Sequence, residues 1–327
     1  MRMVFMGTAE FAVPILAALI EHAAPGQLVT DGLDIVAVVT RQDKPAGRGR
    51  PIVSAPIKQY ALAHGLPVWQ PGSLRRAENQ EALRQLAPDI IIVVAFGQIL
   101  PEEVLKLPRY GCLNVHASLL PRHRGAAPIS AAILAGDPET GVSIMLMDTG
   151  IDTGPVLAQR TLPIAPDDTT ETLTPRLAQL GADLLIETLP RWFKGEIEPQ
   201  PQDESRATAA PMLTKAQGRI DWSQPAELIA RQVRAYQPWP GASTTWRGRL
   251  LKIRRAQALP IDFDRARELP PGKVTMTPSP EGKALVVACG AGALRLEVVQ
   301  LEGKRAVSTD EFLRGYPGIV GETLGAA

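Results

Sequence analysis

The sequence predicts an α/β protein of two domains, a mostly parallel, Rossmann-like sheet followed by a small C-terminal OB-like β-barrel. Two observations predict this fold class. Apolar strands alternate with amphipathic helices up to about residue 194, and short strands separated by Gly and Pro dominate after residue 210. The 327 residues suffice for two hydrophobic cores, and a hydrophobic content of 45% is typical of globular chains and excludes disordered and collagen-like classes.

The predicted first domain alternates strands and helices from the beginning of the chain. The strands are short apolar runs, whereas the helices carry apolar side chains three and four positions apart. Thr8 follows the first strand and is expected to cap the first helix. The expected strands are 2–6, 35–40, 67–70, 89–96, 112–117, 142–148 and 154–163, and the expected helices are 11–20, 57–64, 79–86, 128–135 and 172–193. A parallel sheet of this kind is covered on both faces and binds ligands beyond the carboxyl ends of its strands.

A polar, proline-rich stretch separates the two predicted domains. It predicts a linker over 195–210, between a first domain over 1–194 and a second over 211–327. In the second domain one helix precedes five short strands, expected at 225–235 and at 243–246, 250–256, 272–276, 284–288 and 294–300. Short strands with regular turn signals are typical of an open five-stranded barrel, a fold that commonly binds oligonucleotides.

Apolar run lengths, the first residues and the cysteine content indicate the compartment in which the protein is expected. The longest apolar runs are far shorter than the roughly 18 residues that a membrane span needs, and the first residues show no signal or transit peptide pattern. Cys112 and Cys289 are the only cysteines, which fits a reducing compartment and excludes a disulfide framework. We therefore expect a cytoplasmic protein with no membrane partner.

The near-neutral net charge of +1 hides a difference between the two parts of the chain. Residues 1–207 carry 18 basic and 23 acidic side chains, a net charge of −5, whereas 208–327 carry 17 and 11, a net charge of +6. Residues 231–255 contain seven bases and no acid, with Tyr236, Trp239 and Trp246 among them. Such a pattern suits phosphate contacts and stacking on bases, but it equally fits a solvated strand face whose aromatic side chains belong to the core.

Several familiar sites are excluded by their motifs. The turn over 7–11 lacks the second and third glycines of a dinucleotide fingerprint, and no phosphate-binding P-loop motif occurs. The four histidines, at positions 22, 64, 116 and 123, show no zinc-ligand spacing. We therefore expect neither a nicotinamide or flavin cofactor nor a metal.

One group of polar residues is suited to catalysis. Asn114 and His116 lie two residues apart on a predicted strand, so the amide and the imidazole project from the same face near its carboxyl end. An amide donor beside an imidazole can stabilise a tetrahedral oxyanion, and an acid from the glycine-rich turn 148–154 can orient the histidine or relay a proton. Alone, His116 fits a structural histidine and the turn fits a plain loop. Together they predict the transfer of an activated acyl group.

These segments resemble a known family. The run 114–129 (Asn-Val-His-Ala-Ser-Leu-Leu-Pro-Arg-His-Arg-Gly-Ala-Ala-Pro-Ile) and the run 148–154 (Asp-Thr-Gly-Ile-Asp-Thr-Gly) resemble the 10-formyltetrahydrofolate-dependent formyltransferases. Residues 7–12, 44–50 and 234–242 narrow the resemblance to members that formylate methionyl initiator tRNA. Two departures, His123 in place of Trp and Gln237 in place of Asn, concern only details of substrate contact.

The resemblance implies a reaction and a set of site residues. The methionyl amino group attacks the formyl carbon of 10-formyltetrahydrofolate, and Asn114 donates to the resulting oxyanion. His116 stabilises the same oxygen as the partner of Asp152, which helps to take the proton of the amine. Folate binding is expected at Ser118, Leu119, Leu120 and Pro121, with the pterin against Phe96, Ile99 and Leu100. Contacts to tRNA are expected at Lys44, Arg48, Arg50, Arg234, Arg247, Arg249 and Lys252.

Several alternative interpretations stay open beside this one. The three apolar residues assigned to the pterin also fit ordinary core packing, and Asp148 can be a pterin contact or a turn former. The same chemistry could serve a small amine, such as a purine precursor or a nucleotide sugar, but such an enzyme has no use for a basic C-terminal domain. A non-catalytic RNA-binding module with a ligand-sensing fold would not need Asn114 or His116. We expect a monomer.

Overall fold

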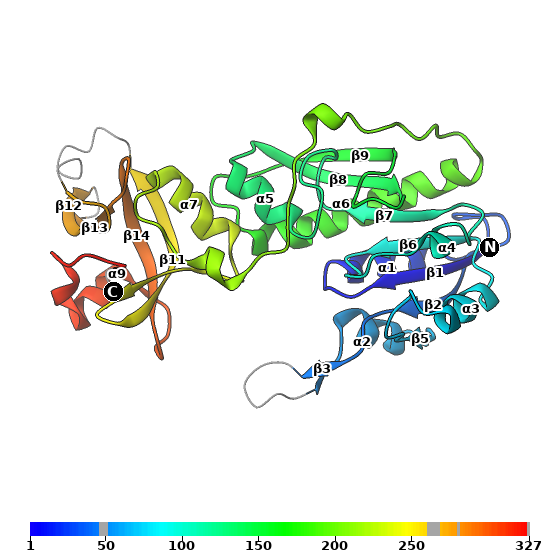
Figure 1. Cartoon of the computed structure of the whole chain (residues 1–327), viewed down its shortest axis with the longest axis horizontal. Coiled ribbons are helices and arrows are strands. Elements are labelled where there is room, and N and C mark those ends of the chain that lie inside the picture. The colour runs from blue at the N-terminus through cyan, green and yellow to red at the C-terminus, as the bar shows by residue number, and fades with distance from the viewer. Residues whose placement is uncertain (46–51, 260–268, 280–281, 326–327) are drawn as a thin grey trace. The chain divides into compact units, whose positions relative to one another are not determined.

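The computed structural model describes residues 1–45, 52–259, 269–279 and 282–325. Its first sheet has seven strands in the order β5-β2-β1-β6-β7-β8-β9 (Figure 1). The strands are β1 (Arg2–Gly7), β2 (Asp34–Val39), β5 (Val68–Trp69), β6 (Ile90–Val94), β7 (Cys112–His116), β8 (Glu139–Leu146) and β9 (Val156–Pro163). All neighbours up to β7 pair in parallel, whereas β8 and β9 are antiparallel. The predicted mostly parallel α/β sheet is confirmed.

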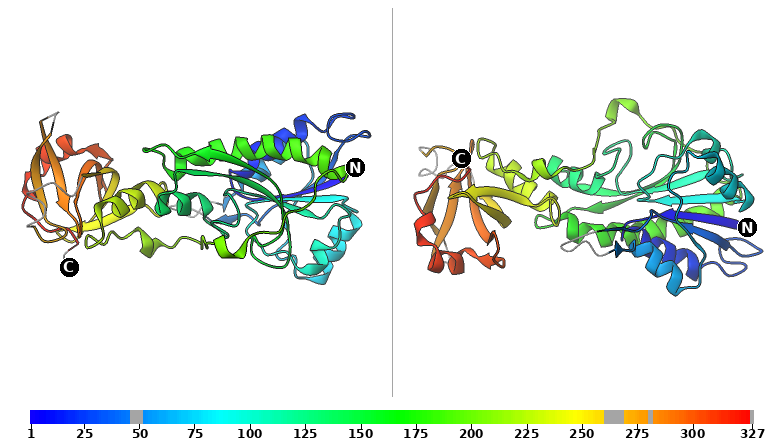
Figure 2. Two further views of the ribbon diagram at one scale, coloured as in Figure 1. Left: turned by 90° about the horizontal axis from the view of Figure 1, so that it is seen from above. Right: turned by 60° about the horizontal axis from the view of Figure 1, so that its bottom comes forward.

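Helices cover both faces of this sheet (Figure 2). The helices are α1 (Ala12–Glu21), α2 (Pro56–Ala63), α3 (Ala77–Gln85), α4 (Glu102–Leu105) and α6 (Thr170–Phe193). Helix α5 (Pro128–Ala135) groups by its contacts with the C-terminal part of the chain. On one face, buried side chains of α3 and α4, Leu83 and Val104, share a core cluster with Val4, Ile91 and Cys112. Because side chains alternate along a strand, Asn114 and His116 project toward the same face as Cys112.

The other face of β7 is packed against α6. Gly181 on this helix lies so close to the sheet that a Cβ atom there would be 2.9 Å from the Val115 side chain and 3.7 Å from Ile15 of α1. The small residue thus allows α6 to approach the strand that carries the two polar candidates. The backbone of β7 is therefore held from behind by close packing.

Thr8 does not cap the first helix. Helix α1 begins at Ala12, and Phe11 occupies the N-cap position without a side-chain hydrogen bond. The hydroxyl of Thr8 instead donates to the carbonyl of Phe96 at 3.0 Å. The predicted cap is wrong because a short turn separates the strand from the helix, which places Thr8 beside the carboxyl end of β6.

The C-terminal part contains an antiparallel sheet in the order β10-β11-β14-β13-β12, with β15 paired to β14. Its strands are β10 (Ala242–Trp246), β11 (Arg249–Leu259), β12 (Val274–Ser279), β13 (Gly282–Ala288), β14 (Ala293–Leu301) and β15 (Val307–Ser308). Helices α7 (Ala226–Ala235) and α9 (Thr309–Gly315) pack onto it through a core that includes Ile229, Val233 and Phe312. The predicted small antiparallel domain is confirmed.

Contacts divide the chain into two compact units that interleave along the sequence. The first unit is Met1–Pro128, Glu139–Pro163 and Thr174–Pro211, and the second is Ile129–Pro138, Ile164–Leu173 and Met212–Ala327. Hydrogen bonds tie the interposed segments to α7: Arg231 Nη1 donates to the Ala135 carbonyl at 2.8 Å, and Thr170 Oγ1 donates to the Ala235 carbonyl at 2.7 Å. The expected linker over 195–210 lies within the first unit.

Short elements complete the description. Strands β3 (Lys44–Pro45) and β4 (Ile52–Val53) pair with each other, and the predicted tRNA contacts Arg48 and Arg50 lie between them in the sequence, outside the described residues. Single 3₁₀ turns are η1 (Glu204–Arg206), η2 (Lys215–Gly218) and η3 (Pro317–Ile319). Among the described residues, no helix combines the length and the apolar character that spanning a membrane requires.

Candidate active site

Three polar side chains from two elements converge at the carboxyl end of β7. Asn114 and His116 come from that strand, and Asp152 comes from the loop between β8 and β9. The Asn114 Nδ2 donates to Asp152 Oδ1 at 3.1 Å, and Asp152 Oδ2 lies 3.6 Å from His116 Nδ1. The structure therefore brings together the three residues that the sequence predicts as catalytic.

The His116 ring is fixed by the main chain. Its Nε2 lies 3.0 Å from the carbonyl oxygen of His123, and since a carbonyl only accepts, this nitrogen carries the proton. The other ring nitrogen, Nδ1, faces the Asp152 carboxylate at a distance beyond a direct hydrogen bond. The side chain of His116 is 6% exposed and that of Asp152 is 15% exposed, so their electrostatic interaction is only weakly screened by solvent.

Asp152 has an unusual backbone conformation that the surrounding chain supports. Its φ is +53°, in the left-handed region that costs energy for a residue with a Cβ atom. The backbone N–H of Gly125 donates to Asp152 Oδ2 at 2.8 Å. With Asn114 on Oδ1, both carboxylate oxygens therefore accept hydrogen bonds, and the carboxylate is held in one orientation.

This geometry can stabilise negative charge on a reacting oxygen. An amide nitrogen carries two protons, so Asn114 can donate one to Asp152 and offer the other to an oxyanion. A buried carboxylate beside an imidazole can accept a proton from an attacking amine, directly or through water. The site supplies the groups that acyl transfer to an amine needs.

The segment Ser118–Pro121, predicted to bind folate, is rigidly supported from the sheet. Ser143 Oγ donates to the Ser118 carbonyl at 2.6 Å and accepts from the Leu120 N–H at 3.0 Å. Gln159 Nε2 donates to the Leu120 carbonyl at 2.8 Å. The side chains of Ser118 and Leu120 are buried, whereas Leu119 and Pro121 are half-buried.

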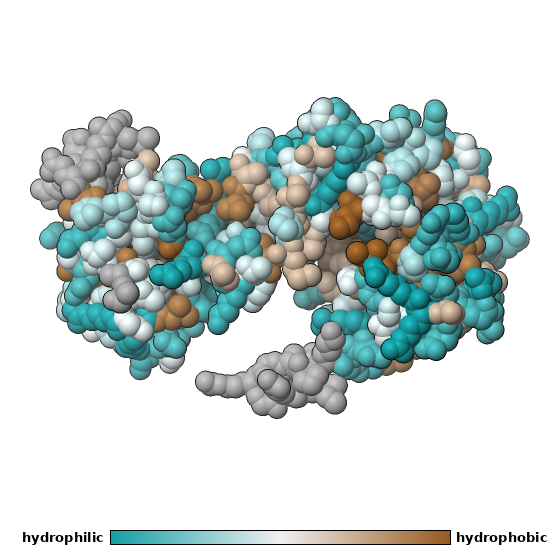
Figure 3. Space-filling model, viewed as in Figure 1, coloured by the Kyte–Doolittle hydropathy of each residue, from teal (hydrophilic) through white to brown (hydrophobic). Residues whose placement is uncertain are grey.

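The three apolar residues predicted to contact a pterin differ in exposure. Phe96 and Leu100 are 3% and 4% exposed and belong to the core cluster under α3 and α4, whereas Ile99 is 58% exposed. Figure 3 shows apolar surface on the first unit, in the region where Figure 1 places β6 and β7. Ile99 thus presents its side chain to solvent, whereas Phe96 and Leu100 follow the alternative of core packing.

The residues predicted to bind tRNA fall into three groups. Arg48, Arg50 and the side chain of Lys44 lie outside the described residues. Arg234 is half-buried and donates to the Asp168 carbonyl at 2.9 Å, and burial lowers the pKa of its guanidinium. This arginine therefore has a structural partner within the second unit.

The other predicted tRNA residues belong to the hairpin of β10 and β11, Arg247 in its turn and Arg249 and Lys252 on β11. Arg247 and Arg249 are exposed, and Lys252 is half-buried on the opposite face of β11 from the buried Leu251. Arg247 also forms an ion pair with Glu322 at 2.6 Å. Arg249 and Lys252 are the members of this group that present cationic groups on the strand itself.

The aromatic residues of the basic segment belong mainly to the core. Tyr236 and Trp246 are 4% and 6% exposed, and Trp246 packs against Phe312 and Tyr316. Only Trp239 among the three is open to solvent, at 55% exposure. A stacking role is thus compatible with Trp239, while the other two follow the alternative of core packing.

Residues to which the sequence analysis gives no role also support the site. Arg124 and Gly125 from the loop after β7, together with Gln202 and Thr208, form hydrogen bonds around His123 and Asp152. Gln202 and Thr208 lie in the stretch predicted as a linker, where composition indicates no contact with a catalytic strand.

Among the residues that the structure describes, no group of three or more His, Cys, Asp or Glu is arranged to hold a metal ion.

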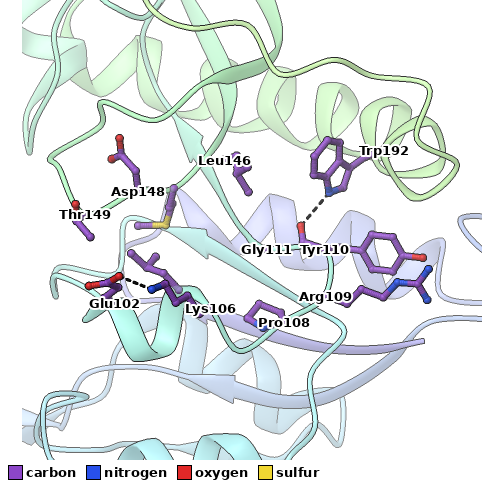
Figure 4. A pocket seen from close by; sticks show the side chains of 12 residues that line it. Glu102, Lys106, Pro108, Arg109, Tyr110, Gly111, Leu146, Asp148, Thr149 and Trp192 are labelled. Atoms are coloured by element: carbon purple, nitrogen blue, oxygen red, sulfur yellow. Dashed lines mark hydrogen bonds and ion pairs between the residues drawn. The ribbon is translucent and has the colours of Figure 1, made fainter.

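A separate pocket of about 400 Å³ lies at the amino-terminal end of β7 (Figure 4). It is lined by α4, Pro108–Gly111, Leu146–Thr149 and Trp192, and the Trp192 Nε1 donates to the Tyr110 carbonyl at 2.9 Å. Gly111 directly precedes β7 whereas His116 ends it, and none of Asn114, His116 and Asp152 lines the pocket. The pocket is therefore distinct from the convergence of Asn114, His116 and Asp152.

Comparison with known proteins decides the family. The formyl transferase family model matches residues 1–189, and the model of the formyl transferase C-terminal domain matches 212–317. A methionyl-tRNA formyltransferase of Myxococcus xanthus is 50% identical over 96% of this chain and 95% of its own length. The chain belongs to the methionyl-tRNA formyltransferase family. A second relative of that name, from Methylococcus capsulatus, is 49% identical over 99% of this chain and its whole length.

The family resemblance extends to solved structures. An N-formyltransferase from Helicobacter canadensis, in complex with folinic acid and dTDP-3-aminofucose, matches with a TM-score of 0.62 and 19% identity. The match covers 90% of this chain and 98% of that one. At this identity the likeness concerns the fold, which the two formyltransferases share.

Proposed function

We propose that the chain transfers the formyl group of 10-formyltetrahydrofolate to the amino group of methionyl initiator tRNA. The observation that carries the reaction type is the convergence of Asn114, His116 and Asp152 at the end of β7. Full-length similarity to methionyl-tRNA formyltransferases, in both family domains, supports the acceptor. Folate is here a second substrate, and the reaction consumes its formyl group.

The residues present fit a formyl donor. The second proton of the Asn114 amide is available to the oxygen of the formyl group as negative charge develops on it. His116, whose two ring nitrogens face the His123 carbonyl and the Asp152 carboxylate, acts as the partner of Asp152. Asp152 receives the proton that the attacking amine must lose. Exposed Ile99 and the supported segment Ser118–Pro121 form the proposed contact surface for the folate.

The tRNA is proposed to contact basic residues of both units. Arg249 and Lys252 present cations on β11, and the loop containing Lys44, Arg48 and Arg50 supplies further charge. Phosphate neutralisation by such groups releases counterions, so binding should weaken as the salt concentration rises. We propose that one chain suffices, because a single chain supplies all three catalytic groups, and that it acts in the cytoplasm.

The experiment that tests the proposal measures formyl transfer from 10-formyltetrahydrofolate to three acceptors. Methionyl initiator tRNA is compared with glycinamide ribonucleotide and a dTDP-amino sugar at equal concentrations. We expect product only with the tRNA. Formylation of either small acceptor without the tRNA would contradict the proposed substrate, and absence of transfer to all three would contradict the proposed reaction.

A further inference from the structure

Gln202 uses its whole hydrogen-bonding capacity on the two loops of the active site. Its Nε2 donates to the carbonyl of Asp152 at 2.8 Å and to the carbonyl of Gly154 at 2.7 Å. Its Oε1 accepts from Nε and Nη2 of Arg124, at 3.0 and 2.9 Å. Both protons and both lone pairs of the amide are thereby engaged. One side chain thus joins the loop that carries Asp152 to the loop that contains Arg124.

These two loops also meet at the carboxylate itself. The N–H of Gly125, the neighbour of Arg124, donates to Asp152 Oδ2 at 2.8 Å. Arg124 is anchored in turn on Glu204, to which Nη1 and Nη2 donate at 2.9 and 2.7 Å, and this guanidinium lowers the pKa of the Glu204 carboxyl. Gln202 therefore binds the backbone carbonyl of Asp152, while the backbone N–H of Gly125 binds the carboxylate of Asp152.

The left-handed backbone of Asp152 needs such support. With φ at +53°, the residue would relax toward a more common conformation unless its neighbours prevent this. The bonds from Gln202 hold the carbonyl of the strained residue and the carbonyl of Gly154, two residues later, in place. Relaxation would carry the carboxylate away from Asn114 and His116, and a misplacement of about 1 Å can cost on the order of 100-fold in rate.

We propose that Gln202 is a positioning residue that sets the place of the Asp152 carboxylate relative to Asn114 and His116. The inference rests on the proposed function for its effect on rate, but the placement it describes is a property of the folded chain. Gln202 acts through Asp152 and contacts neither substrate. The polar stretch between the two family domains thereby contributes to catalysis.

The first test compares Gln202→Met with Gln200→Met in formyl transfer to methionyl-tRNA. Methionine matches glutamine in length and is neutral, and Gln200 lies two residues away with its Nε2 donating to the Glu198 carbonyl. We expect Gln202→Met to lower kcat by about 10- to 100-fold with both KM values nearly unchanged, and Gln200→Met to be active. Equal kcat values for the two variants would overturn the proposal.

The second test asks whether the effect passes through Asp152. In an Asp152→Asn background, Gln202→Met should lower kcat by less than about 3-fold, because the group that it positions is already lost. Multiplicative effects of the two substitutions would show that Gln202 acts elsewhere, and would overturn the proposal. Thermal unfolding of each variant shows that the compared proteins are folded.

A third measurement separates this inference from the proposed function. Nuclear magnetic resonance of ¹⁵N-histidine-labelled protein reports on the His116 ring without any substrate. Gln202→Met should move the His116 ring signals in the same direction as Asp152→Asn does, and Gln200→Met should leave them in place. Unmoved signals in Gln202→Met overturn the positioning role even if the chain formylates no acceptor. Loss of formyl transfer by the unaltered chain bears only on the proposed function.

Discussion

At the scale of single residues, the active site depends on donors whose direction is fixed before a substrate arrives. Asn114 lies on a central strand with close packing behind it, and its amide is oriented by the Asp152 carboxylate. Such preorganised donors contribute more to catalysis than mobile ones, because they need no rearrangement when charge develops. Strand β7, which carries Asn114, and the Asp152 carboxylate, which orients its amide, together set the direction of the proposed oxyanion donor.

Replacing Asn114 tests this role. We expect Asn114→Ala to lower kcat by about 100- to 1,000-fold, the usual effect of removing one oxyanion donor, with little change in the KM for tRNA. Steady-state kinetics with methionyl-tRNA measures both values. Asn79→Ala is the control, because Asn79 lies on α3 and its side chain donates to the Ser73 carbonyl, away from the three polar residues of the site. A kcat within 3-fold of the unaltered chain would exclude Asn114 as the donor.

The two cysteines give a prediction of a different kind. Burial raises the pKa of Cys112 and of Cys289 to about 12, so both thiols stay protonated in the folded protein at pH 8. We expect no reaction with a disulfide reagent in the native state, and two equivalents after unfolding in guanidinium. Because unfolded thiols ionise near pH 8.5, the free energy of unfolding should fall as the pH rises from there toward 12. Rapid labelling of the native protein would contradict this prediction.

At the scale of elements, the loop between β8 and β9 is shaped by a close backbone contact. A Cβ atom on Gly154 would lie 1.9 Å from the Leu146 carbonyl oxygen and 3.2 Å from the Asp148 nitrogen. Since these are backbone atoms, they cannot rotate away as a side chain can. The loop therefore closes tightly at Gly154, two residues after Asp152.

Gly154→Ala should consequently disturb the site from a distance. We expect a loss of about 1–3 kcal/mol in the free energy of unfolding and a decrease of roughly 10-fold in kcat, because the loop must shift to admit a methyl group. Chemical denaturation and kinetics measure the two effects. Gly72→Ala is the matched control, since its Cβ would meet only Gln42 Nε2, at 3.7 Å. Equal behaviour of the two variants would contradict the close contact.

At the scale of the whole molecule, the change in net charge along the chain coincides with the change from one sheet to the other. The residues up to 207, with a net charge of −5, supply the strands of the mostly parallel sheet, and the residues from 208, with a net charge of +6, supply the antiparallel sheet. We propose that the polyanionic acceptor is attracted to the second part while the first binds the formyl donor. Near neutrality of the chain results from the cancellation of these two contributions.

The charge division predicts the salt dependence of tRNA use. The double variant Arg249→Ala and Lys252→Ala should raise the KM for tRNA and reduce the slope of log affinity against log salt by about two, roughly one for each lost phosphate contact. The KM for the folate should not change. Arg305→Ala serves as the control, because Arg305 is paired with Glu311. An unchanged salt slope in the double variant would exclude this strand as a tRNA contact.

Much of this protein follows from local patterns in its sequence. Apolar periodicity predicts the alternation of strands and helices, because the pattern reports directly which face of each element is buried. The spacing of Asn114 and His116 predicts that their side chains share a face, and their residue types indicate oxyanion chemistry. The Thr8 cap was wrong because strand and helix are joined through a turn whose length no local pattern specifies.

Only the tertiary structure decides which distant groups hold the catalytic residues. Gln202 lies 50 positions from Asp152, and the Gly125 N–H is a backbone donor, which any residue other than proline supplies. Folding likewise buries Tyr236 and Trp246 and leaves Trp239 exposed, although all three stand in one basic segment. The sequence determined the reacting groups, because chemistry depends on residue type. The fold determined their support, because hydrogen bonds between distant loops depend on position in space.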